Sequence, residues 1–259
     1  MTEFARSTGL AGVEARRSCQ SNSCYRHHTH AEFSVGRIES GASVLSGSVG
    51  QSTRLREGDV VVVPPEHVHA CNPEGRLWRY RMVHLPRGVV RRWAPGLVDI
   101  RGIGIYRDSL VRREADALVD GVFADLPVPE LGAEIRRAAF ALSAVAPLVR
   151  LPLQTSDPAP VVLTPVLWTL ANAPEIPSLT ELAASLHMTP AQFARAVRRS
   201  TGMAPMAWRQ DQRIRQARTM LRKGASIAQT AAELGFSDQS HFHRVFRKHV
   251  AATPGGYRG

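Results

Sequence analysis

Hydrophobic and polar residues alternate along several short stretches in the first half of the chain. Residues 32–39 and 76–85 follow this pattern, residues 42–49 form a similar short segment, and residues 60–63 are a continuous apolar run. Alternation with a period of two is typical of half-buried strands, and the glycines and prolines between these segments indicate turns. Several short strands of this kind predict an antiparallel β-barrel or sandwich over residues 1–106.

The period of the hydrophobic pattern changes after residue 106. Apolar residues recur at helical spacing in residues 109–123 and again in 131–145, which predicts two amphipathic helices. We expect this helical segment, residues 107–149, to pack against the barrel or to form the contact between two subunits of a homodimer. Three prolines within residues 150–160 prevent a continuous helix and predict an extended linker.

The remaining residues, 161–259, contain an internal repeat. Residues 182–186 (LAASL) are matched by residues 230–234 (TAAEL), and Phe193 is matched by Phe242. Each copy has the pattern of a short helix, a tight turn and a longer helix with basic residues, which is typical of a helix-turn-helix. Two copies predict an all-α domain that reads two successive segments of the DNA major groove. The chain as a whole is therefore predicted to be an α+β multidomain protein.

Local signals predict where the helices of both copies begin. Ser178 is followed by the spacing of a capping box, and Thr189 precedes a proline, so these two residues should cap the helices of the first copy. In the second copy Ser226 should cap the first helix, and either Ser237 or Asp238 the second. The outward residues that we expect to contact DNA are Thr189, Ala191, Gln192 and Arg195 in the first copy and Ser237, Gln239, Ser240, His243 and Arg244 in the second.

Positive charge is concentrated in the same half of the chain. The formal net charge is +11, and residues 161–259 hold 13 Arg and Lys against 5 Asp and Glu, which is +8 and leaves +3 for residues 1–160. This distribution fits one nucleic-acid module beside a module with another task, although a charge excess by itself also favours solubility. Three cysteines do not make a disulfide framework, and no signal segment or long apolar run is visible. These features predict a cytoplasmic protein without a membrane partner.

The second copy resembles the AraC family of bacterial transcription regulators. The resemblance is carried by residues 227–242 (IAQTAAELGFSDQSHF), by residues 244–247 (RVFR), and by the later Thr-Pro and Tyr-Arg pairs. It implies a helical bundle with two helix-turn-helix units, double-stranded promoter or operator DNA as the partner, and RNA polymerase as a second partner if the protein is an activator. One departure is His187, which stands in the first turn where glycine is common and predicts a slightly strained backbone there.

Histidines in the barrel half indicate a binding site. His28, His30 and Glu32 are spaced so that they would share one side of a strand, and a second cluster that includes His69 follows Pro64-Pro65. The two clusters resemble the short motifs of the cupin (jelly-roll) barrel, a common sensor domain in the AraC family. The resemblance implies His28, His30 and His69 as ligands of a divalent metal. However, the glutamate ligand of that motif is missing, because the chain has Ser34 and Val35 at its place.

The same region is predicted to be the pocket for a small-molecule effector, with or without a metal. Its expected lining residues are His28, His30, Glu32, His69 and Tyr80. No cofactor is expected to be required. Alternatively, the histidines hydrogen-bond only to one another and Tyr80 fills the core.

Three functions are consistent with these patterns. The first is an effector-controlled, sequence-specific transcription regulator that acts as a homodimer and is not an enzyme. The second is a metal-dependent cupin enzyme fused to a DNA-binding module, which the missing glutamate disfavours. The third is a DNA-binding protein that responds to no ligand.

Overall fold

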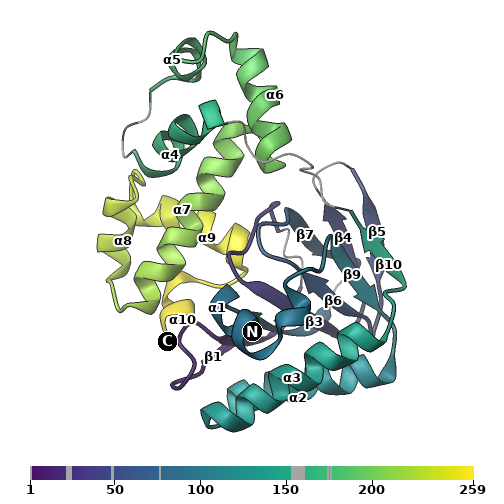
Figure 1. The fold of residues 1–259 in the computed structure, drawn as a ribbon. Helices are drawn as coiled ribbons and strands as arrows, with labels where there is room; N and C mark the ends of the chain where they lie inside the picture. The colour runs from purple at the N-terminus through teal and green to yellow at the C-terminus, as the bar shows by residue number, and fades with distance from the viewer. Residues whose placement is uncertain are drawn as a thin grey trace. The chain divides into compact units, whose positions relative to one another are not determined.

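The computed structural model describes residues 2–21, 25–47, 50–75, 77–152, 161–173, 175 and 177–259. The described chain separates into two compact units (Figure 1). One contains the strands and helices α1–α3, and the other contains helices α4–α10. None of the helices in the described residues is both long and apolar enough to cross a bilayer.

Two antiparallel sheets build the first unit. The larger has the strand order β1-β2-β8-β3-β6-β9-β10, and the smaller has the order β5-β4-β7. This confirms the predicted antiparallel β-domain. The N-terminal residues, which show no clear alternation, form two strands of the larger sheet, β1 and β2. The strands are β1 (Thr2–Arg6), β2 (Glu14–Gln20), β3 (Phe33–Ser40), β4 (Ser43–Gly47), β5 (Ser52–Leu55), β6 (Val60–Val63), β7 (His69–Pro73), β8 (Trp78–Leu85), β9 (Ile103–Tyr106) and β10 (Val149–Leu151).

The larger sheet has two chemically different faces, and strand β8 shows why. Successive side chains of a strand point to opposite faces. Val83 and Leu85 therefore belong to the apolar core that the sheet shares with helices. Tyr80 and His84 point to the other face, which we call the inner face, and both are buried there. The alternation visible in the sequence thus assigns successive residues of β8 in turn to the helix-covered core and to the inner face.

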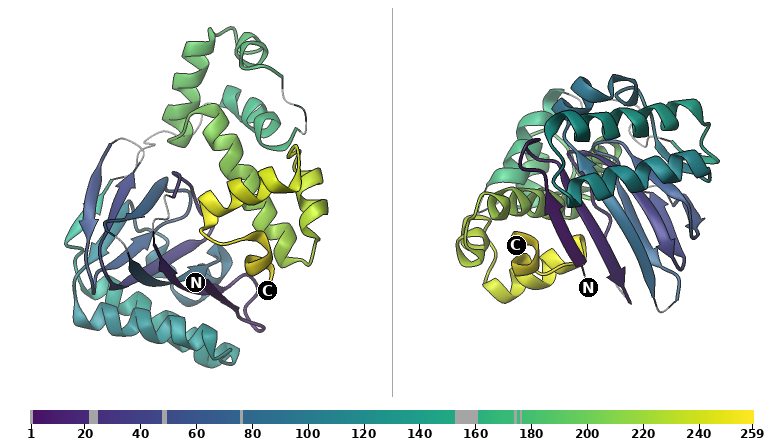
Figure 2. Two further views of the ribbon diagram at one scale, coloured as in Figure 1. Left: turned by 180° about the vertical axis from the view of Figure 1, so that it is seen from behind. Right: turned by 90° about the horizontal axis from the view of Figure 1, so that it is seen from below.

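Two long helices cover the outer face of the larger sheet. Helices α2 (Ser109–Phe123) and α3 (Val128–Ala144) lie side by side along it (Figure 2). Their apolar sides pack with outer-face residues such as Val35 and Val83 in one core. A short helix, α1 (Arg87–Trp93), and the 3₁₀ turn η1 (Pro95–Leu97) pack beside α3. The helical segment predicted after the barrel is therefore confirmed as two helices.

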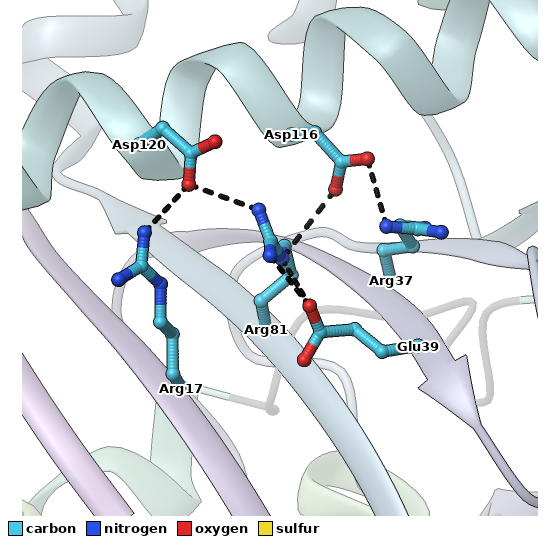
Figure 3. A network of polar contacts seen from close by, with 6 residues as sticks. All are labelled: Arg17, Arg37, Glu39, Arg81, Asp116 and Asp120. Atoms are coloured by element: carbon cyan, nitrogen blue, oxygen red, sulfur yellow. Dashed lines mark hydrogen bonds and ion pairs between the residues drawn. The ribbon is translucent and has the colours of Figure 1, made fainter.

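Ion pairs fix the position of helix α2 on the sheet. Asp116 and Asp120 are one helical turn apart and face three neighbouring strands (Figure 3). Arg81 of β8 lies 2.9 Å from Asp120 and 3.5 Å from Asp116, and its Nε donates to Glu39 at 2.7 Å. Arg17 of β2 donates to Asp120 at 2.7 Å, and Arg37 of β3 donates to Asp116 at 2.8 Å. Arg37, Arg81 and Asp116 are largely buried, whereas Asp120 is exposed. Because the groups share partners, they restrain α2 more than isolated surface pairs would.

Over residues 161–259 the regular elements that the structure describes are all helices, and they include two helix-turn-helix units, as predicted. Helices α5 and α6 form the first, helices α8 and α9 form the second, and the long helix α7 connects them. The elements are η2 (Val161–Leu163), α4 (Thr164–Asn172), α5 (Leu179–Ala184), α6 (Pro190–Thr201), α7 (Pro205–Arg222), α8 (Ile227–Glu233), α9 (Gln239–Val250) and α10 (Pro254–Arg258).

Two boundaries differ from the sequence-based expectation. The predicted linker began at Arg150, but strand β10 extends to Leu151 and pairs with β9, because backbone pairing there outweighs the neighbouring proline. Helix α3 begins at Val128, before the start expected at Leu131, and Pro129 stands in its first turn, where the missing N–H costs nothing. Residues 153–160 of the predicted linker lie outside the described residues.

The first helix-turn-helix contains the strained turn that its sequence predicts. His187 has a φ of 55°, whereas Gly235 takes the corresponding left-handed conformation in the second turn with a φ of 67°. A side chain with a Cβ is disfavoured in this region, while glycine is not.

We predict that His187→Gly stabilises the protein by about 1 kcal/mol, because it removes the Cβ from a left-handed position. Urea unfolding of the full chain, followed by helical circular dichroism, measures the change. The matched control is Ala184→Gly at the end of helix α5, which should destabilise because glycine there only adds freedom to the unfolded chain. Equal destabilisation by both variants would contradict the assignment of strain to His187.

Candidate functional site

The first helix-turn-helix is held by two capping boxes. Ser178 Oγ accepts from Glu181 N at 3.2 Å, and Glu181 Oε2 accepts from Ser178 N at 2.7 Å, as the sequence predicts. At the start of α6, Thr189 Oγ1 accepts from Gln192 N at 3.2 Å, and Gln192 Oε1 accepts from Thr189 N at 2.8 Å. The Gln192 side chain therefore has a structural task at the helix start in addition to its predicted task at DNA.

The second helix-turn-helix uses single caps. Ser226 Oγ accepts from Gln229 N at 3.1 Å at the start of α8. Of the two candidates for the start of α9, Asp238 is the cap, because its carboxylate accepts from His241 N at 2.6 Å. Ser237 donates to this carboxylate at 3.1 Å instead of capping the helix itself. The His241 backbone bond, the Ser237 hydroxyl and the charge of Arg244 together lower the pKa of Asp238.

Both longer helices present polar and basic residues to solvent. On α6 the exposed basic residues are Arg195, Arg198 and Arg199, and on α9 they are Arg244, Arg247 and Lys248. The predicted DNA-contacting residues that are exposed are Thr189, Ala191, Gln192, Arg195, Ser237, Gln239, Ser240 and Arg244.

His243 differs from the other predicted contact residues. It is only partly exposed, its ring lies edge-on to Phe242 with centroids 6.4 Å apart, and its Nε2 is buried without a hydrogen-bond partner among the described residues. The His243 ring is therefore less exposed than the sequence pattern suggested.

Three buried imidazoles lie close together in the first unit. The ring centroid of His30 lies 5.0 Å from that of His69 and 4.7 Å from that of His84, and all three side chains are buried. His84 also lies within hydrogen-bond distance of Ser34 Oγ, at 2.8 Å. The structure thus brings together two of the predicted pocket residues and adds His84 and Ser34, which alternation on β8 and β3 places on the inner face.

The predicted metal ligands also converge. One ring nitrogen from each of His28, His30 and His69 can be chosen so that all lie within 4.8 Å of one another. His28 Nδ1 donates to the Arg26 carbonyl at 2.8 Å, and His69 Nδ1 donates to the His67 carbonyl at 2.9 Å. Because a carbonyl can only accept, Nδ1 carries a proton in both residues, and in a neutral ring the lone pair is then on Nε2, which is the form that binds metals.

The inner face carries a second polar group that the sequence did not reveal. On β2 the buried side chains at alternate positions are Glu14, Arg16, Ser18 and Gln20, all of them polar. The Arg16 guanidinium lies 5.1 Å from the ring centroid of Tyr80, a predicted pocket residue. A buried polar stripe with period two would have been a signal for binding, had β2 been recognised as a strand. Glu32, the remaining predicted pocket residue, is partly exposed just before β3.

Two family models match the chain in agreement with this geometry. The AraC-like ligand binding domain matches residues 10–146, and the helix-turn-helix domain matches residues 182–259. Since the first match alone covers more than half of the chain, the protein belongs to the AraC family of transcription regulators. It combines an N-terminal ligand-binding domain with a C-terminal DNA-binding domain.

Individual relatives agree with this assignment. The chain is 25% identical to the arabinose operon regulatory protein of Escherichia coli (strain K12) over 224 residues, which are 81% of this chain and 74% of that protein. It is 36% identical to the regulatory protein PocR of Salmonella typhimurium over 81 residues, 31% of this chain and 27% of that protein. The crystal structure of ToxT from Vibrio cholerae O395 matches 100% of this chain and 96% of its own, with a TM-score of 0.55 at 13% identity, which shows a shared fold.

These findings confirm the predicted family and fold. The matched relatives are transcription regulators, so the prediction of a regulator and not an enzyme is also confirmed.

Proposed function

We propose that a small-molecule effector binds the inner face of the sensor domain and controls DNA binding by helices α6 and α9. The observation that carries the proposal is the density of buried polar side chains on and beside this face: His30 and His69 next to His84 in one cluster, and Arg16 beside Tyr80 in another. Polar groups are costly to bury, so a domain that buries several on one face has them there for more than packing. By linkage, effector and DNA then alter each other's affinity by the same factor.

The proposed DNA contacts fall on the two matched helices of the repeat. Thr189, Ala191, Gln192 and Arg195 of the first unit would lie at one major-groove segment, with Arg195 as its main base-reading group, since alanine offers only apolar contact. The second unit would contribute more hydrogen bonds. Its proposed contact residues are Ser237, Gln239, Ser240, His243 and Arg244, with a smaller part for the partly buried His243.

A divalent metal is a candidate occupant of the sensor domain. His28, His30 and His69 fit such an ion, because one ring nitrogen from each imidazole converges, and imidazole suits several divalent metals. The metal would supply positive charge at which an anionic or polar effector could bind. Neither the family nor the fold requires this ion, so a metal-free pocket that uses the same residues is the alternative.

We also propose that the protein acts as a homodimer in the cytoplasm and, if it is an activator, contacts RNA polymerase. Support for the dimer comes from helix α3, where Phe140 is 71% exposed although its neighbours Ala139 and Ala141 are buried. A large apolar side chain this exposed on a long helix fits an isologous contact with the same helix of a second copy.

We predict that Arg244→Ala weakens operator binding by about 1–3 kcal/mol, because it removes a direct contact to a base edge. Gel-shift titrations at fixed salt, with operator and with unrelated DNA, measure the change. The matched control is Arg247→Ala, three residues later on α9, which should weaken both DNAs to the same extent. Unchanged operator affinity of Arg244→Ala would contradict the assignment of α9 as a reading helix.

We predict that a thermal-shift screen of the full chain with metabolites and divalent metals finds a ligand that raises the melting temperature, because binding to the folded state alone must stabilise it. His69→Ala should abolish the shift, and His67→Ala should keep it, because His67 lies outside the convergent group. A shift that both variants retain would place the site elsewhere. Operator affinity that is identical with and without the ligand would instead favour a regulator that responds to no effector.

We predict that Phe140→Asp converts a dimer to a monomer in sedimentation velocity, because it places a charge in the contact between α3 helices. The matched control is Ala124→Asp, an equal charge at the exposed end of α2, which should remain dimeric. A dimer that survives Phe140→Asp would show that α3 is not the contact.

A further inference from the structure

Helix α7 buries three arginine side chains. Arg209, Arg213 and Arg218 are 5%, 9% and 8% exposed, and all three lie on the helix that connects the two helix-turn-helix units. Arginine is rarely buried to this extent unless its guanidinium is engaged by other groups. Each of the three guanidinium groups donates a hydrogen bond to another part of the unit.

Two of these arginines hold the ends of other helices. Arg209 Nη1 donates to the carbonyls of Leu170 and Ala173 at 2.8 and 2.9 Å, which close helix α4. Arg213 Nε donates to the carbonyl of Leu234 at 2.7 Å, and Leu234 is the residue that ends helix α8. The last carbonyls of a helix have no partner inside it and carry partial negative charge, so a cationic donor is well suited to them.

Arg213 contacts both sides of the second turn. Its guanidinium carbon lies 3.8 Å from the ring centroid of Phe236, the residue that follows the turn glycine. The Phe236 ring in turn lies 5.0 Å from that of Phe242 and 5.4 Å from that of His241, both on α9. Arg213 thus connects Leu234, the residue that caps the end of α8, to the side chains that pack against the first turn of α9.

The cation remains charged at neutral pH although it is buried. Burial, together with the charge of Arg209, lowers the pKa of Arg213 to about 10. Its interaction with the Leu234 carbonyl and the Phe236 ring is therefore that of a full positive charge in a poorly solvated place, where such contacts are stronger than at the surface.

The first copy of the repeat has no charged residue at the position that corresponds to Arg213. Applying the repeat offset of 48 or 49 residues to Arg213 leads to Thr164 and Pro165 in α4, and residues 161–174 contain no charged side chain. The preceding helix therefore has no arginine with which to hold the first turn, which also carries His187 at a positive φ.

We propose that Arg213 is a positioning residue for DNA reading by helix α9: it fixes the turn between α8 and α9, and so the direction of α9, without touching DNA. This inference rests on the proposed assignment of α9 as a reading helix. Base contacts require side chains to be held within a fraction of an ångström, so a loosened turn weakens the contacts of α9 and leaves those of α6 in place.

The test compares two variants that each remove a buried guanidinium from α7. Wild-type protein first selects an operator from random DNA. The affinities of wild type and Arg244→Ala are then compared on operators in which one half has been substituted. The half that α9 reads is the one whose substitution makes the two affinities equal. The affinity of full-length Arg213→Met and Arg209→Met is then measured at fixed salt on the intact operator and on operator substituted in that half.

Arg213→Met should bind the intact operator about tenfold more weakly than wild type. It should bind the half-substituted operator within about twofold of wild type, because the contribution of α9 is already absent there. Arg209→Met should keep the wild-type ratio between the two DNAs. Hydrogen exchange should be faster at the amides of His241 and Phe242 in Arg213→Met than in wild type.

Phe236→Leu provides a second variant should Arg213→Met fail to fold. It removes the ring under the guanidinium and should reduce the same ratio. If a folded variant keeps the wild-type ratio of affinities for the two DNAs, whether or not both affinities fall, the positioning role is overturned. If Arg244→Ala itself distinguishes no half, the assignment of α9 fails and this inference fails with it.

Discussion

The ends of short helices impose the constraint on which the DNA-binding unit depends. Helices α5, α8 and α10 have 6, 7 and 5 residues, so most of their backbone N–H and C=O groups have no partner within the same helix. Such helices are not stable alone and must be completed by groups outside them. Ser178 and Ser226 complete the starts of the first two, and Arg213 donates to the end of α8. The geometry of both reading units follows from these bonds.

The sensor unit depends on a different constraint, the alternation of side chains along its strands. Tyr80 and Arg81 are neighbours on β8 but face opposite sides of the sheet, and the same holds for Arg16 and Arg17 on β2. The first member of each pair belongs to the proposed ligand face. The second forms ion pairs with helix α2. Residues that would contact an effector therefore lie one position from residues that hold the helices on the sheet.

Much of the architecture could be predicted from the sequence, because the signals are local. Capping boxes depend on residues three positions apart, and the box predicted at Ser178 is confirmed, as is the cap predicted at Thr189. The strained turn at His187 is likewise a property of one residue type at one place. Helix α1 and strand β10 were missed, because they are short and are stabilised by contacts with elements distant in the sequence.

The sequence by itself determined the two-module organisation, the helix-turn-helix repeat and the family, since periodicity, caps and motif spacing are encoded over a few residues. Only the tertiary structure decided which buried groups meet. The grouping of His84 with His30 and Ser34, the polar inner side of β2 and the bond from Arg213 to Leu234 join residues 21 to 54 positions apart or on different strands. Such contacts arise when separate elements pack, and no local pattern specifies which side chains packing will bring together.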